Sequence, residues 1–245
     1  MTQVIAMPRS TMTEQVAAQR AYYAATAARY DEMHLHERDE HYFALNFMVS
    51  VLDYLGVHSV LDIGSGTGRA LSEIKQRAPA VRVVGIEPSR ELREQGHCKG
   101  IAPAELVDGD AQALRYRDGE FDLVCEFGAL HHIPDPDRAV GEMLRVAKTA
   151  IFISDCNNFG QGGVLMRAAK QAINALGLWP VANYFKTGGK GYQFTEGDGV
   201  AYSYSVFNQY DRIRRACRSV HLVNTLDAGP NLYRSAPCVA ILGIK

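Results

Sequence analysis

The middle of the chain alternates short, nearly continuous apolar runs with stretches whose apolar residues recur at helical spacing. Continuous apolar runs are typical of strands buried on both faces, and the alternation indicates βαβ units around a parallel sheet. The runs that we expect to be strands are 59–63, 81–87, 104–110, 121–127 and 149–155.

Two further apolar runs follow near the end of the chain, at 219–226 and 235–244. The turn-rich link DAGPNLYR joins them without a crossover helix, so we expect these two strands to pair antiparallel. The predicted fold is therefore α/β: a Rossmann-like, doubly wound sheet of seven mostly parallel strands whose last strand is antiparallel.

We expect a single domain, because the 245 residues contain neither an internal repeat nor an obvious linker. Apolar residues at helical spacing precede the first strand, and a stretch rich in glycine, asparagine and aromatic residues interrupts the pattern after the fifth. The predicted parts are a helical cap or lid (1–57), a cofactor-binding core (58–155), a substrate-side insertion (156–205) and the C-terminal strands (206–245).

Charge and cysteine content narrow the class of protein. The formal net charge is −1, with acids and bases intermixed, which argues against a nucleic-acid-binding surface. The five cysteines form no CxxC pair, which predicts reduced thiols rather than a disulfide framework or a zinc site. No stretch has the apolar length of a secretory signal or of a transmembrane helix, so we expect a cytoplasmic protein.

A glycine-rich turn, within VLDIGSGTG (60–68), links the first predicted strand to the next helix. Such a turn suits an anion or a nucleotide, because a helix N-terminus presents free N–H groups and a partial positive charge. The dinucleotide pattern GxGxxG is not met, since Gly68 comes one residue early and Arg69 holds the last position. Asp62 would repel a pyrophosphate but attract an ammonium group, which favours a nucleoside with a cationic tail over NAD.

Two more carboxylates end the next two predicted strands. Glu87 stands about 20 residues beyond the glycines, where such folds place the acid that holds a ribose diol. Asp110 could accept a hydrogen bond from an adenine amino group. Either residue alone could be a helix cap or a surface charge, but together with Asp62 they indicate an adenosyl ligand.

These motifs resemble those of the class I S-adenosylmethionine-dependent methyltransferases, above all the group similar to the ubiquinone and menaquinone biosynthesis methyltransferases. The resemblance covers residues 58–155 and rests on VLDIGSGTG, GIEPS, DGDAQALRYRDGEFDLV and GALHHIPDPDRAVGEMLRVAK. One departure is the shortened RVAKTA, where the family usually has RVLKPGG. The resemblance implies S-adenosyl-L-methionine as cofactor.

The resemblance also assigns residues to each part of the cofactor. It places the methionine end on the glycine turn, the ribose and adenine on the next two strand ends, and a lid tyrosine over them. The residues are Asp62, Gly64, Ser65, Gly66 and Gly68 for the methionine end, Glu87 and Pro88 for the ribose, Asp110 and Ala111 for the adenine, Glu126 and Phe127 along the cofactor, and Tyr30 from the lid.

Methyl transfer requires alignment of the acceptor behind the methyl group, and a base only if the acceptor must lose a proton. His131 and His132 follow the fourth strand and are the candidate bases. We favour His131, because the family commonly carries a structural histidine at the position of His132. Asp155 or Asn157 could orient an acceptor hydroxyl. Asp155 and Asn157 could also be magnesium ligands, as a similar pair is in the catechol-type methyltransferases. We expect no metal, because those enzymes also need an aspartate at the end of the fourth strand, where this chain has Glu126.

The insertion is the least family-like part and is the expected acceptor-recognition region. Lys186 and Lys190 stand among glycines and aromatic residues and could hold an anionic group, although a flexible surface loop would have the same composition. We expect a small-molecule acceptor, methylated on oxygen, that is an anionic, sugar-linked or lipid-linked biosynthetic intermediate. Methylation of nitrogen or carbon, a non-catalytic cofactor-binding protein, and a homodimer stay open.

Overall fold

The computed structural model of the chain describes residues 12–36, 38–226 and 228–245. Two expectations concern residues 1–11: the absence of a secretory signal and the start of the predicted cap. These residues lie outside the described part of the chain. Within the described ranges, no helix is both long enough and apolar enough to cross a bilayer.

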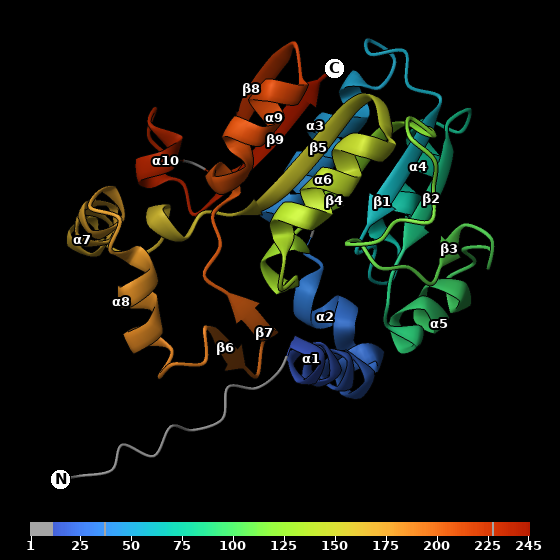
Figure 1. Ribbon diagram of the computed structural model, residues 1–245. Helices are drawn as coiled ribbons and strands as arrows, with labels where there is room; N and C mark the ends of the chain where they lie inside the picture. The colour runs from blue at the N-terminus through green and yellow to red at the C-terminus, as the bar shows by residue number, and fades with distance from the viewer. Residues whose placement is uncertain (1–11, 37, 227) are drawn as a thin grey trace, which may run out of the picture.

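Seven strands form the main sheet (Figure 1). They are β1 (Ser59–Ile63), β2 (Arg82–Ile86), β3 (Leu106–Val107), β4 (Phe121–Phe127), β5 (Ala147–Cys156), β8 (Ser219–Asn224) and β9 (Cys238–Ile244). Their order is β3-β2-β1-β4-β5-β9-β8. The first five pair parallel, whereas β9 runs antiparallel to both β5 and β8. The predicted doubly wound fold with an antiparallel last strand is confirmed.

Helices cover both faces of this sheet, because successive strand residues point to opposite sides. One core cluster joins Leu61 and Val124 to α6 (Pro136–Val146) and α9 (Tyr210–Ala216). The other joins Val60 and Leu123 to α3 (Glu40–Val51) and α4 (Arg69–Arg77). The alternation within β1 and β4 therefore builds two cores from one pair of neighbouring strands.

Two predicted elements are shorter than expected. The first part of the predicted helical cap is not one continuous helix but consists of α1 (Met12–Thr26), a 3₁₀ turn and α2 (Tyr30–His34). At the break the Thr26 hydroxyl donates to the Tyr22 carbonyl at 2.9 Å, a side-chain bond that disfavours continued helix. The third strand pairs only at Leu106–Val107, at the sheet edge, before the polar sequence DGD.

The insertion contains regular structure that the sequence pattern does not reveal. It forms α7 (Val164–Ala175), α8 (Trp179–Lys186) and a hairpin of β6 (Tyr192–Thr195) and β7 (Gly199–Tyr202). Figure 1 shows α7 and α8 at the left of the molecule beyond the sheet, while the hairpin turns back toward α1. The short α10 (Leu232–Ser235) packs against α7. The insertion thus has an outlying helical part and a hairpin that returns to the core.

Candidate active site

The main cavity lies at the carboxyl ends of β1, β2 and β4, the edge at which doubly wound sheets bind ligands. The turns after these strands form one side of the cavity, and residues of α1 line it as well. Predicted residues that line it are Tyr30, Gly64, Glu87, Pro88, Asp110, Ala111, Phe127 and His132, and α1 adds Val16, Gln19, Arg20 and Tyr23.

A smaller cavity adjoins the first and contains Asp62 and Ser65. Tyr30, Gly64 and Phe127 line both cavities, so these three residues stand at their junction. An elongated ligand that occupied both cavities would pass beside Tyr30 and would reach Asp62 at one end. The structure thereby brings together most of the cofactor-binding residues expected from the sequence.

The glycines of the turn have distinct roles. Gly64 lines both cavities, whereas Gly66 and Gly68 shape the turn. All three have positive φ, between 56° and 87°, a conformation that other residues rarely adopt. A Cβ on Gly66 would lie 2.9 Å from the Tyr30 hydroxyl, and one on Gly68 would lie 2.1 Å from Ile101 Cδ1. The turn therefore requires glycine both for its backbone and for the close approach of its neighbours.

Asp62 and Glu87 are buried carboxylates beside these cavities. Glu87 accepts the N–H of Gly66 at 3.1 Å and of Ser89 at 2.8 Å. Burial raises the pKa of Asp62 and the pKa of Glu87 to about 7. Neither carboxylate forms an ion pair within the described part of the chain. A ligand that carries an ammonium group and hydroxyl groups would give these two acids a cation to pair with and hydrogen-bond donors.

Glu126 and Asp155 line neither cavity. The Glu126 carboxylate is fully buried and accepts the N–H of Ala129 at 2.8 Å. Asp155, also fully buried, accepts the N–H groups of Leu130 at 2.8 Å and His131 at 3.2 Å. Both acids hold the turn after β4, in contrast to the expected places of Glu126 along the cofactor and of Asp155 at the acceptor. Asn157 is likewise buried, and it binds backbone carbonyls near α10.

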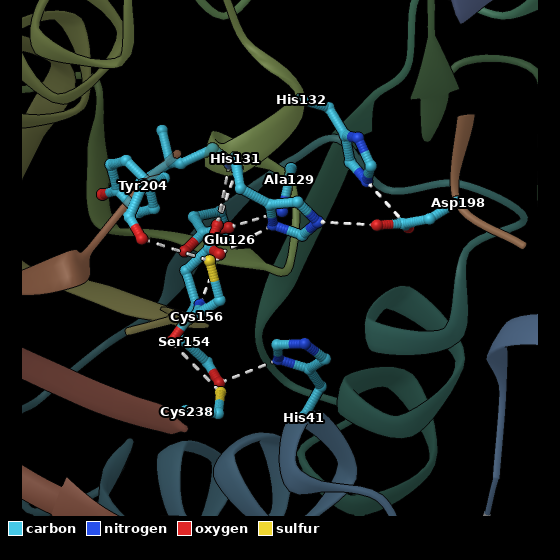
Figure 2. Close-up of polar contacts among 12 residues, drawn as sticks. His41, Glu126, Ala129, His131, His132, Ser154, Cys156, Asp198, Tyr204 and Cys238 are labelled. Atoms are coloured by element: carbon cyan, nitrogen blue, oxygen red, sulfur yellow. Dashed lines mark hydrogen bonds and ion pairs between the residues drawn. The ribbon is translucent and has the colours of Figure 1, made fainter. Parts of the chain in front are cut away.

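The two candidate bases both reach Asp198, as Figure 2 shows, and they differ in their second partner. His131 places Nδ1 2.7 Å from Asp155 Oδ1 and Nε2 3.6 Å from Asp198 Oδ2. His132 donates from Nδ1 to the Val200 carbonyl at 2.6 Å, and its Nε2 lies 3.3 Å from Asp198 Oδ1. His132 lines the main cavity, whereas His131 lies between two carboxylates. The geometry thus favours His132, the histidine that the sequence analysis ranked second.

Asp198 is a site residue that sequence reasoning missed. It lies in the link between β6 and β7 and reaches His131 and His132 across the molecule. Burial alone would raise its pKa, but hydrogen bonds from the two histidines lower the pKa of Asp198. Gln19 of α1 supports the same region by accepting the N–H of Val200. No sequence signal marked Asp198, because its partners lie more than sixty residues away.

The charge state of His131 predicts a pH dependence of stability. Burial lowers the pKa of His131, but Asp155 and Asp198 outweigh burial and raise it from 6.5 to about 10. The folded state therefore binds more protons than the unfolded state between these values, so this stabilisation is full below pH 6.5 and is lost toward pH 10. Urea unfolding from pH 6 to 10 should show a steeper fall for the wild type than for His131→Gln. Equal slopes would contradict the ion pairs.

Comparison with known proteins agrees with this geometry. A family model that describes a methyltransferase domain matches residues 61–152. Phosphatidylethanolamine N-methyltransferase of Cereibacter sphaeroides is 33% identical over 119 residues, which cover 46% of this chain and 57% of that enzyme. Demethylmenaquinone methyltransferase of Thermus thermophilus is 32% identical over 91 residues, 36% of this chain and 41% of that enzyme. The matched segment thus spans only about half the length of these curated relatives.

Solved structures share the fold over nearly the whole chain. Magnesium protoporphyrin IX methyltransferase of Synechocystis, determined with S-adenosylhomocysteine, superposes with a TM-score of 0.59 at 16% identity and covers 95% of this chain and 99% of that one. The (4+2)-cyclase SpnF has the same TM-score at 18% identity and covers 98% of each chain. Such a fold hosts more than one reaction, so activity must be argued from the site. Residues 61–152 therefore match a methyltransferase domain, and the chain shares its fold with magnesium protoporphyrin IX methyltransferase and with SpnF.

Proposed function

We propose that this protein binds S-adenosyl-L-methionine in the two joined cavities and transfers its methyl group to a small-molecule acceptor. The observation that carries the proposal is the pair of buried acids beside a glycine turn, Asp62 and Glu87, which form no ion pair within the described residues. Asp62 would bind the ammonium group, and Glu87 the ribose hydroxyls. Asp110 and Ala111, with the apolar side chains of Ile86 and Leu92 nearby, would hold the adenine.

We propose oxygen as the methylated atom, because His132 can serve as a base at the cavity wall. The cofactor supplies an electrophilic methyl group on its sulfonium. The Val200 carbonyl fixes one hydrogen of His132 on Nδ1, so Nε2 is the nitrogen that can act as base. Nε2 lies 3.3 Å from Asp198, and it would accept the proton of an acceptor hydroxyl when the ring is neutral and that hydroxyl replaces the contact with Asp198. Tyr23 and Tyr30 narrow the cavity under α1 and would exclude water. An anionic, sugar-linked or lipid-linked acceptor stays a prediction.

Calorimetric titration tests the cofactor directly. We expect purified protein to bind S-adenosylmethionine and S-adenosylhomocysteine and not NAD. Both sulfur nucleosides carry an ammonium group that can pair with Asp62, and NAD carries none. NAD serves as the control, since it shares the adenosine but places a pyrophosphate where Asp62 would repel it. Folded protein that binds neither sulfur nucleoside would overturn the proposed function.

A further inference from the structure

The insertion exposes large apolar side chains that nothing in the described chain covers. Among the described residues, nine of the twelve exposed large hydrophobic side chains lie between 164 and 194. The most exposed are Leu165 (86%), Phe185 (76%), Leu176 (72%) and Val164 (71%). Isolated apolar residues on a surface are ordinary, but such a concentration marks an interaction site. We call the exposed side chains of residues 164–185, together with Lys186 and Lys190, the α7–α8 surface.

The helices beneath this surface have no core of their own. No residue from 161 to 198 is buried. Polar contacts attach one side of the pair to the body: Arg167 donates to the Ser235 carbonyl at 3.1 Å, and Gln171 donates to the Phe159 carbonyl at 2.9 Å. At the start of α8, the Trp179 N–H donates to Ser203 at 3.0 Å. The attached side thus uses these polar contacts together with the packing of the Trp179 ring on Phe159. The exposed apolar side chains are left facing outward, where Figure 1 shows α7 and α8 projecting from the molecule.

The charge around these apolar side chains has one sign. Residues 161–195 include four basic residues and no acidic residue, although the whole chain has a net charge of −1. The four are Arg167, Lys170, Lys186 and Lys190, of which Lys186 and Lys190 are exposed. Burial, followed by the nearby charges of Lys186 and Arg167, lowers the pKa of Lys170, so these cations lie close together. The surface is thus both apolar and cationic.

These two properties select one occupant. A second copy of the chain, packed about a two-fold axis, would bring the same cations against each other. A nucleic acid would leave the apolar side chains without a partner. An anionic bilayer satisfies both properties, because apolar side chains enter the boundary between headgroups and acyl chains while lysines meet the phosphates.

We propose that the α7–α8 surface docks this protein on anionic lipid membranes as a peripheral protein. Docking goes beyond the proposed methyl transfer and does not depend on it. The surface leads through β6 to Asp198 and Val200, which contact His132 at the cavity wall. In a docked protein the bilayer would therefore lie against the side of the molecule that carries the insertion, and the insertion extends from there to the cavity.

Co-sedimentation of the full chain with vesicles tests the proposal. The probes are vesicles of phosphatidylcholine alone and vesicles with about 30 mol% phosphatidylglycerol. We expect the partition coefficient to be at least about tenfold higher on the anionic vesicles and to fall as salt rises from about 0.1 M to about 0.5 M. Lys186→Gln/Lys190→Gln and Leu165→Ser/Phe185→Ser should each lower it by roughly tenfold or more.

Matched controls separate docking from general surface change. Tyr54 is 86% exposed and the Lys148 side chain is 71% exposed, and both lie outside the insertion, so Tyr54→Ser and Lys148→Gln should bind vesicles like the wild type. All four variants, two double and two single, alter only exposed side chains, and circular dichroism checks that each keeps the fold. Wild-type protein that stays in solution with both vesicle types would overturn the proposal. A dimer in solution that Phe185→Ser dissociates would overturn it as well, because the surface would then bind a second copy.

Discussion

Replacing His132 by glutamine should lower kcat for methyl transfer roughly 100- to 10,000-fold, the usual contribution of a positioned general base. His132 lines the main cavity, and the Val200 carbonyl holds a hydrogen on its Nδ1. Glutamine keeps an amide that can bind Val200 but offers no basic nitrogen. The measurement is kcat at saturating cofactor, followed from pH 5 to 9, with the acceptor that screening identifies.

The neighbouring histidine provides the matched control. His131→Gln removes an imidazole one residue away that is paired with Asp155 and Asp198 and does not line the main cavity. We expect it to reduce stability while leaving kcat close to the wild-type value. His132→Gln should lower kcat and leave the affinity for S-adenosylhomocysteine unchanged. A His132→Gln enzyme with the wild-type kcat, or one that changes only KM, would contradict a role as base.

The choice between these histidines shows where sequence reasoning stops. Both follow β4 within the same short 3₁₀ turn, Leu130–His132, so pattern alone places them at the same edge of the sheet. Their ring centroids lie 4.0 Å apart and both rings contact Asp198, but their Nδ1 atoms have different partners. Asp155, at the end of the neighbouring β5, holds His131, and Val200 of the insertion hairpin holds His132. These partners come from distant segments, and no local signal in GALHHIPDP encodes them. The sequence therefore predicted the edge of the sheet but not which ring faces the cavity.

The glycine turn shows the opposite case. Its conformation depends on residues within a few positions of one another, because positive φ at Gly64, Gly66 and Gly68 is a local requirement. The buried strand β1 before it is equally local, being a run of apolar residues. Hence both the turn and the strands of the core could be predicted. The helices α7 and α8 were not predicted, because the glycines and asparagines around them favoured an irregular segment. In α7 the helical spacing is nevertheless present in the sequence, since Arg167, Lys170 and Asn174 share one face.

Replacing Asp62 by asparagine should weaken binding of S-adenosylmethionine by about 1.5–3 kcal/mol, or roughly 10- to 100-fold, through loss of one charged hydrogen bond. Asp62 forms no ion pair within the described residues, so an ammonium group on the ligand would be its first cationic partner. Asparagine has nearly the same shape, and the apo fold should tolerate it. The measurement is the Kd for S-adenosylhomocysteine by calorimetry, with exposed Asp53→Asn as the control that should bind like wild type.

Proton release gives the same prediction an independent readout. Burial raises the pKa of Asp62 from 3.8 to about 7, so near pH 7 a fraction of the apo protein carries a proton there. Pairing with an ammonium group lowers that pKa, and binding should therefore release protons from this residue. Calorimetry at pH 7 in phosphate and in Tris buffer should show this release for the wild type and less of it for Asp62→Asn. Equal release by both proteins would mean that the ammonium group does not bind at Asp62.

The apo protein should respond to the same exchange in the opposite direction. Because the folded pKa of Asp62 is raised, the folded state binds more protons than the unfolded state between pH 3.8 and about 7, and stability falls as pH rises through this window. At pH 8 the wild type therefore bears the full cost of a buried charge, which asparagine avoids. We expect Asp62→Asn to unfold in urea at the same or a higher concentration than wild type. An Asp62 that lowers the stability of the apo protein and raises its affinity for a cationic ligand serves binding. An Asp62→Asn variant that is less stable than the wild type at pH 8 would instead show that Asp62 stabilises the fold.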